Sequence, residues 1–153
     1  QQGAWAYYNN NTTYACPYGK LYNWYACVDA RGLCPTGWHV PSDGEWTVLT
    51  TFLGGGIIAG VAMKSTGTIQ AGTGLWNSPN TGATNSSGFS GLPGGYRGIV
   101  GNYDGMGFNG YWWSSTQDDS NGPWVRYLYN NAASVGRGNA YTRSGWGVRC
   151  LRD

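Results

Sequence analysis

Strand-forming residues dominate two segments that enclose the last third of the chain, and this pattern constrains the fold more than any other feature of the sequence. Residues 111–116 and 145–153 are rich in Trp, Tyr, Val and Thr and are bounded by Gly or Asn, which predicts a β-strand for each. Between them, the large side chains of residues 124–129 alternate, so we expect a further strand with one packed face and one face toward water.

Residues 130–143 have few large apolar side chains and consist mainly of Asn, Ser, Ala, Gly, Tyr and Arg. This composition is typical of recognition surfaces rather than of protein cores. Five of the nine basic residues also lie in the last third: Arg126, Arg137, Arg143, Arg149 and Arg152. Two interpretations of these arginines stay open, a shared binding face and separate solvated side chains. The sequence predicts binding here without naming the ligand.

The overall composition indicates one domain and excludes several classes of protein. A chain of 153 residues can bury a core but is short for two domains. Only 10% of the residues are charged, 16% are aromatic and 27 are Gly, so the surface must be mostly polar and uncharged, which suits sugars and proteins as partners. A formal charge of +2 is too small for a general nucleic-acid binder. No apolar run approaches the roughly 20 residues of a membrane span, so no membrane insertion is expected.

Cysteine usage favours disulfides over a metal site. The chain has four cysteines: Cys16, Cys27, Cys34 and Cys150. They show no C-x-x-C spacing and His39 is the only histidine, which disfavours zinc. Disulfides in an oxidising compartment fit better, and the sequence alone allows three pairings. The chain begins at Gln1 without Met or a leader, which indicates a processed mature form or an excised domain.

Residues 42–53 carry the signals of a helix. Ser42 can cap its start, and Glu45, three residues on, can complete a capping box. Four apolar residues are expected on one helical face: Trp46, Leu49, Phe52 and Leu53. The glycines at 54–56 can end the helix by adopting positive φ.

Short strands and ordered loops are expected elsewhere. Residues 1–17 are predicted to form an arm or edge strand, and residues 21–26 have strand-like aromatics. Residues 67–110 are dense in Gly, Asn, Ser, Thr and Pro but too long for one structureless loop. We therefore expect strands near residues 89–92 and 96–100, joined by structured loops.

No motif points to catalysis or to a cofactor. Residues 105–110 match G-x-G-x-x-G, but aromatic residues follow where a dinucleotide site needs a helix. Residues 102–104 with Asn109 could offer oxygens to calcium, although a turn explains their irregular spacing better. His39 and the seven acidic residues form no catalytic pair in the sequence. We expect no enzyme activity, no cofactor and no metal.

Several longer motifs resemble those of one bacterial family. They are YGKLYNWYA (18–26), CPTGWHVPSDGEW (34–46), LWNSPNTGATN (75–85), GFSGLPGGYR (88–97), GYWWSST (110–116) and VRCLRD (148–153). In this order they resemble the Fibrobacter succinogenes major paralogous domain family, which is similar to C-type lectin-like domains and more distantly to the formylglycine-generating enzyme fold. The resemblance implies an α+β, C-type lectin-like domain over residues 18–153, with twisted antiparallel strands, few helices and long ordered loops, on a secreted or surface protein.

The resemblance extends to C-type lectin-like domains that retroelements diversify at adenine-containing codons. Residues 118–144 have the composition favoured at such variable positions. Residues that match the fixed frame are Trp112, Trp113, Ser114, Ser115, Val135, Gly145, Val148 and Cys150. Ordinary surface drift would leave a similar composition, so both explanations stay open. The family comparison also implies two disulfides, Cys34–Cys150 at family positions and Cys16–Cys27 as an added pair.

These observations predict a ligand-binding domain of a bacterial or phage surface protein, such as an adhesin or pilus tip. Its partner would be a protein or glycan on a cell surface, or another subunit of a surface assembly. The predicted binding residues are Asp118, Asp119, Trp124, Arg126, Tyr127, Tyr129, Asn131, Ala133, Arg137, Asn139, Tyr141 and Arg143. We expect at least one of Trp124, Tyr127 and Tyr129 to belong to the core. The alternatives are a structural module of a surface assembly and, less favoured, an enzyme of the formylglycine-generating type, whose catalytic cysteine arrangement is not evident here.

Overall fold

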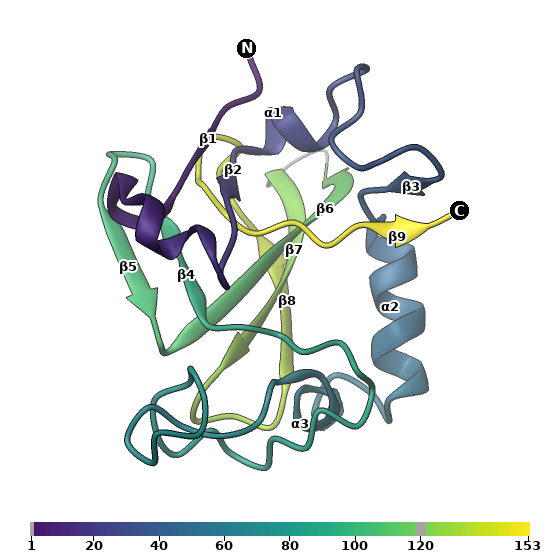
Figure 1. Ribbon diagram of the computed structural model, residues 1–153. Coiled ribbons are helices and arrows are strands. Elements are labelled where there is room, and N and C mark those ends of the chain that lie inside the picture. The colour runs from purple at the N-terminus through teal and green to yellow at the C-terminus, as the bar shows by residue number, and fades with distance from the viewer. Residues whose placement is uncertain (1, 119–121) are drawn as a thin grey trace.

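The computed structural model describes residues 2–118 and 122–153 and combines short helices with small antiparallel sheets (Figure 1). Its strands are β1 (Trp5–Ala6), β2 (Leu21–Tyr22), β3 (Trp38–His39), β4 (Gly94–Arg97), β5 (Tyr103–Met106), β6 (Asn109–Asp118), β7 (Gly122–Tyr129), β8 (Val135–Asn139) and β9 (Leu151–Arg152). Its helices are the 3₁₀ turns η1 (Tyr8–Asn10) and η2 (Thr12–Ala15) and the α-helices α1 (Trp24–Cys27), α2 (Asp43–Phe52) and α3 (Ala59–Met63). The expected mixture of strands with few helices is confirmed. None of these helices is long and apolar enough to cross a membrane.

The antiparallel sheet β6-β7-β8 runs through the centre of the molecule, with α2 along one side (Figure 1). β6 and β7 contain the strands predicted at residues 111–116 and 124–129. Their register pairs Tyr111 with Tyr127 and Trp112 with Arg126, and it shifts between Trp113 and Gln117. Because side chains alternate along a strand, this register decides which predicted site residues share a face.

The protein buries a separate hydrophobic cluster on each face of this sheet, because Trp112 and Trp113 are neighbours on β6 and point in opposite directions. The cluster around Trp112 contains Trp46, Ala59, Met63, Trp76, Leu128 and Val135. The cluster around Trp113 contains Trp24, Cys27, Val40 and Val125. The central sheet is thus packed on both sides over part of its length.

Helix α2 starts and ends as its sequence predicts. Ser42 Oγ accepts a hydrogen bond from Glu45 N (3.3 Å), and Glu45 Oε2 accepts one from Ser42 N (2.8 Å), which completes the capping box. Trp46 is 3% exposed, whereas Phe52 is 86% exposed, so the predicted inward position of Phe52 is wrong. At roughly 100° per residue, Phe52 lies about 120° around the helix from Trp46. The helix buries only a narrow stripe.

Other predicted strands are shorter than expected or shifted. Residues 21–26 form only the two-residue strand β2, because Asn23 then caps helix α1 by accepting a hydrogen bond from Ala26 N (3.2 Å). Residues 89–92 contribute one bridge, between Gly91 and Lys64, and the strand expected at 96–100 is β4, which ends at Arg97. Residues 145–147 form isolated bridges, so the terminal strand is confined to β9.

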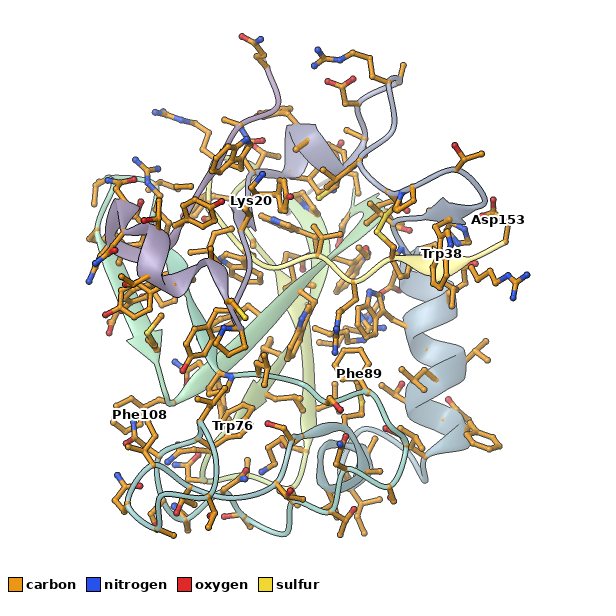
Figure 2. The ribbon with its side chains drawn as sticks, in the orientation of Figure 1. Lys20, Trp38, Trp76, Phe89, Phe108 and Asp153 are labelled. Atoms are coloured by element: carbon orange, nitrogen blue, oxygen red, sulfur yellow. A yellow bond between two sulfur atoms is a disulfide. The ribbon has the colours of Figure 1, made fainter. Side chains whose placement is uncertain are left out.

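The loops between α3 and β4 are held by buried side chains. Trp76 is fully buried, among the loops at the bottom of Figure 2, and its Nε1 donates to the Gly91 carbonyl (3.1 Å). The ammonium of buried Lys64 donates to three carbonyls, those of Thr81 (2.8 Å), Tyr129 (3.3 Å) and Ala132 (2.7 Å). One side chain therefore connects the loop at residue 81 to the turn between β7 and β8.

Candidate binding face

Strand alternation divides the predicted binding residues between the two faces of β7. Trp124 and Arg126 lie on the face toward α2. Tyr127 and Tyr129 alternate with them along β7 and lie on the other face, where Tyr127 pairs with Tyr111. Tyr127 packs against the cluster around Trp113, and Tyr129 is 36% exposed. The predicted residues therefore do not form one continuous patch.

Five aromatic side chains form a half-exposed surface on β4, β6, β7 and the segment before β9. We call it the aromatic face, and it consists of Tyr96, Tyr111, Tyr127, Tyr129 and Trp146. Tyr111 is central: its ring centroid lies 5.4 Å from Tyr96, 6.0 Å from Tyr127 and 4.7 Å from Trp146. Tyr127 and Tyr129 are 5.2 Å apart. These spacings are those of rings in direct contact.

Two glycines on β8 determine the position of Tyr127. Gly136 pairs with Tyr127 across the strands, and a Cβ built on Gly136 would overlap the tyrosine ring. A Cβ on Gly138 would meet the same ring at 3.5 Å. The ring of Tyr127 therefore occupies the space that side chains at these positions would take, and it is fixed against the sheet.

The polar groups of the aromatic face gather near Tyr111. Burial raises the pKa of Tyr111, and the hydroxyl of Tyr129 and the carboxylate of Asp104 raise it further, so its hydroxyl stays protonated. The face thus combines apolar ring surfaces with tyrosine hydroxyls, and the carboxylate of Asp104 lies near enough to act on Tyr111. Such groups can stack on a ligand and exchange hydrogen bonds with it.

The predicted residues on the other face of the sheet hold helix α2. Asp43 accepts hydrogen bonds from Arg126 Nη1 (2.6 Å) and from Arg137 Nη2 (2.9 Å). Burial alone would raise the pKa of Asp43, but the hydrogen bonds from Arg137 and Arg126 outweigh it and lower that pKa. The guanidinium of Arg137 also stacks 3.4 Å from the ring centroid of Trp124. Arg126 is only 2% exposed, so it is not part of an exposed binding face.

The remaining predicted residues lie at the two ends of this sheet. Asn131 and Ala133 are in the turn between β7 and β8, whereas Tyr141 and Arg143 are exposed in the loop after β8. At that end Asn139 Nδ2 also donates to the Gly122 carbonyl (3.1 Å). Asp118 ends β6. Asp119 lies outside the described residues.

The predicted binding residues do not include three members of the aromatic face, Tyr96, Tyr111 and Trp146. The strands at 111–116 and 145–153 were predicted as scaffold only. The alternation of side chains along residues 111–116 could have indicated Tyr111, because Tyr111 and buried Trp112 point to opposite faces of β6. The contact with Tyr96 and Trp146 depends on loop geometry that no local pattern indicates.

The structure confirms one predicted disulfide and contradicts the other. Cys34 and Cys150 are bonded, with their Cα atoms 5.8 Å apart. Cys16 is free and exposed, and Cys27 is free and buried, so the predicted Cys16–Cys27 bridge is wrong. Cys27 lies in α1 rather than at the end of a strand, and the helix turns it into the cluster around Trp113. Burial raises the pKa of the Cys27 thiol to about 12, which keeps it protonated and unreactive.

Within residues 2–118 and 122–153, no group of three or more His, Cys, Asp or Glu side chains is placed to hold a metal ion. His39 instead lies between two carboxylates. Its Nδ1 is 2.5 Å from Asp153 Oδ1 and its Nε2 is 3.0 Å from Glu45 Oε1. These contacts link β3, α2 and the end of the chain.

The fold and the aromatic face define a small α+β domain that displays fixed aromatic rings on an antiparallel sheet. The model of the family described as Fibrobacter succinogenes major domain matches residues 1–152, so the chain belongs to this family. This confirms the family resemblance found in the sequence motifs. No curated protein and no solved structure matches the chain significantly.

Proposed function

We propose that the domain binds a ligand through its aromatic face, as a module of a bacterial or phage surface protein such as an adhesin. The observation that carries the proposal is the contact of five half-exposed rings on one surface. Tyrosine and tryptophan provide large contact areas with few rotatable bonds, so they bind at a low cost in conformational entropy. Their flat faces suit sugar rings and the apolar parts of proteins.

The rings of Tyr127 and Trp146 are held in place before any ligand binds, which supports the proposal. Tyr127 is held by Gly136 beneath it, and Trp146 stacks on buried Trp113 with centroids 5.0 Å apart. A surface that is already ordered loses little freedom when a ligand binds, so more of the contact energy contributes to affinity. Tyr129 is the most exposed member and is the residue we expect to contact the ligand most directly.

The Cys34–Cys150 disulfide supports an extracellular or cell-surface location, since such bonds persist in oxidising compartments. We extend the proposal to a C-type lectin-like fold, which the family resemblance implies. The ligand is then a glycan or protein on another cell, or a pilus or similar assembly subunit.

Glycan arrays and pull-downs against host and bacterial surface proteins test the proposal. The informative variant is Tyr129→Ala, and its matched control is Tyr141→Ala, which removes a tyrosine that is 74% exposed outside the aromatic face. We expect Tyr129→Ala to weaken binding to the ligand found at least about tenfold, as for a central interface tyrosine. Equal binding by both variants, or no ligand on any array or in any pull-down, would count against the aromatic face.

An exposed apolar surface on α2 favours the alternative of a structural assembly module. Val48 and Phe52 are four residues apart on the helix and are 70% and 86% exposed, and nearby Ile57 is 88% exposed. Large apolar side chains gathered at a surface often mark contacts with another protein. If assembly is the main role, Phe52→Asp should reduce incorporation into the surface structure, whereas Tyr129→Ala should leave it unchanged.

We also propose that residues 118–144 are diversified by a retroelement. Side chains such as Asn131, Arg137 and Tyr141 are exposed, so replacement there would alter the surface more than the core. The test is the neighbouring DNA. A reverse transcriptase gene beside a near-copy of this coding segment that differs at adenines supports diversification, and the absence of both from the complete genome counts against it.

A further inference from the structure

A concave surface lies between β1, the end of β4 and residues 143–145, and its volume is about 250 Å³. We call it the cationic groove, because Arg97 and Arg143 both line it. The two arginines are far apart in the sequence. They are brought together by a pair of backbone hydrogen bonds between Arg97 and Gly145, each 2.8 Å long. The groove is therefore built by the tertiary fold rather than by one mobile loop.

The positive charge of the groove has no counter-ion in the described part of the chain. The acid-paired arginines are elsewhere: Arg137, for example, binds Asp43. No described carboxylate forms an ion pair with Arg97 or Arg143. The nearest aromatic partner of Arg97 is Tyr103, whose ring centroid is 5.9 Å from the guanidinium carbon. Both guanidinium groups keep their planar sets of donors for a ligand.

A third cation stands beside the groove. Lys20 Nζ lies 3.9 Å from the ring centroid of Trp5, and Trp5 lines the groove (Figure 2 labels Lys20). This lysine likewise forms no ion pair with a described acid. Lys20 does not itself line the groove, so direct contacts come from Arg97 and Arg143, and Lys20 adds only to the positive field near them.

The groove also offers one neutral hydrogen-bond donor at its wall, the side-chain amide of Asn10. Asn10 Oδ1 accepts a hydrogen bond from the Tyr103 hydroxyl (2.7 Å), which orients the amide. Its Nδ2 has no hydrogen-bond partner within residues 2–118 and 122–153. Trp5 is 53% exposed and adds an apolar edge. A fixed amide beside the two guanidinium groups suits a ligand that carries both hydroxyls and an oxyanion.

The cationic groove and the aromatic face are different surfaces. Tyr96 contacts the ring of Tyr111, whereas its neighbour Arg97 packs against Gly145. Likewise Trp146 belongs to the aromatic face, while Gly145 lines the groove. Adjacent residues of the same segments thus serve the two surfaces separately.

We propose that the cationic groove binds the carboxylate of a uronic acid unit in an acidic polysaccharide. Arg97 and Arg143 bind the carboxylate through charge-assisted hydrogen bonds, and Asn10 donates to a ring hydroxyl. The small volume of the groove, about 250 Å³, and the amide donor favour one sugar acid unit over an acidic peptide, whose extended backbone would need a longer channel. This binding site goes beyond the proposed function, because it uses a surface apart from the aromatic face.

Isothermal titration with oligouronides tests the inference. The probes are trigalacturonate, a hyaluronan oligosaccharide and a mannuronate oligomer, each compared with its methyl ester, and a glutamate-rich peptide is a separate arm. We expect at least one oligouronide to bind, its ester to bind at least about tenfold more weakly, and affinity to fall as salt rises to about 0.15 M. Arg143→Ala and Arg97→Gln should each lower the affinity at least about tenfold.

The matched control is Arg152→Ala, since Arg152 is an exposed arginine on β9 that does not line the groove. It should leave the affinity unchanged. Arg143 lies in an exposed loop, so its variant remains informative even if Arg97→Gln disturbs the bridge to Gly145. Equal binding of acid and ester, equal losses for Arg152→Ala and Arg143→Ala, binding of the peptide alone, or no binding of any oligouronide would each overturn the proposal.

Discussion

The guanidinium of Arg137 and the carboxylate of Asp43 meet through two hydrogen bonds, Nε to Oδ1 at 3.0 Å and Nη2 to Oδ2 at 2.9 Å. The same carboxylate accepts a bond from buried Arg126. One acid at the first turn of α2 therefore fixes the helix to β7 and β8 together. The arginines that the sequence suggests as ligand contacts are partly structural.

Asp43→Ala should destabilise the protein much more than Arg137→Ala. Removing Asp43 leaves the buried charge of Arg126 without its counter-ion, which costs about 3–5 kcal/mol. The Arg137 side chain is 46% exposed, so its loss should cost about 1 kcal/mol or less. Urea denaturation measures both values. Similar losses for the two variants would show that Arg126 does not depend on Asp43.

Gly136→Ala should destabilise the sheet by about 1–3 kcal/mol, because the new methyl group overlaps the ring of Tyr127. Gly138→Ala is the matched control, since its methyl group would meet the same ring at an ordinary 3.5 Å. In a Tyr127→Ala background the penalty at Gly136 should shrink. A double-mutant cycle without coupling between Gly136 and Tyr127 would contradict this packing.

His39 should make stability depend on pH above its ordinary pKa of 6.5. The hydrogen bonds that the protonated His39 ring donates to Asp153 and then to Glu45 raise the pKa of His39 above its ordinary value of 6.5. The folded state therefore holds the proton more tightly than the unfolded state. This stabilisation is complete below about pH 6.5 and is lost as pH rises through the higher folded-state pKa.

Denaturation midpoints of the wild type and of His39→Gln, measured from slightly acidic to alkaline pH, check this prediction. The wild type should lose stability across the window, while His39→Gln should show a flatter profile. Parallel profiles would mean that the two carboxylates do not favour the charged imidazole.

Trp46→Ala should cost roughly 3–5 kcal/mol, because the indole is buried and its Nε1 donates to the Trp113 carbonyl (3.2 Å). Phe52→Ala on the same helix should stay within about 0.5 kcal/mol of the wild type, since Phe52 is exposed. Ser42→Ala should cost about 1 kcal/mol through loss of the cap. Thermal unfolding ranks the stabilities of the three variants. A large loss of stability in Phe52→Ala would show that the buried face of α2 includes Phe52.

Local signals in the sequence predicted local structure correctly. The capping box of Ser42 and Glu45 involves neighbours in the chain, and so does the helix end at Gly54, whose φ is 97°. The strands within β6 and β7 were predictable for the same reason, since alternation is a property of adjacent residues. Asn23 was a similar signal that was overlooked, because the aromatics around it resemble a strand.

Contacts between distant segments were not predictable from composition. Arg126 and Tyr127 are neighbours in the chain, and both residue types are common at protein surfaces. The pairing of β6 with β7 places Arg126 against Asp43 and Tyr127 against Tyr111. Cys16 and Cys27 are close in sequence, but α1 turns Cys27 inward. The Cys34–Cys150 pairing was predicted from the family resemblance, because the spacing of the cysteines allows three pairings.

Three backbone carbonyls converge on the ammonium group of Lys64. Carbonyl oxygens from several loops can also converge on a bound calcium ion. Here the positive charge is covalently attached to the chain, so chelators and dilution cannot remove it. The turn that carries Asn131 and Ala133 is consequently held by a side chain of the protein itself. A domain built in this way needs no bound cation at these three carbonyls.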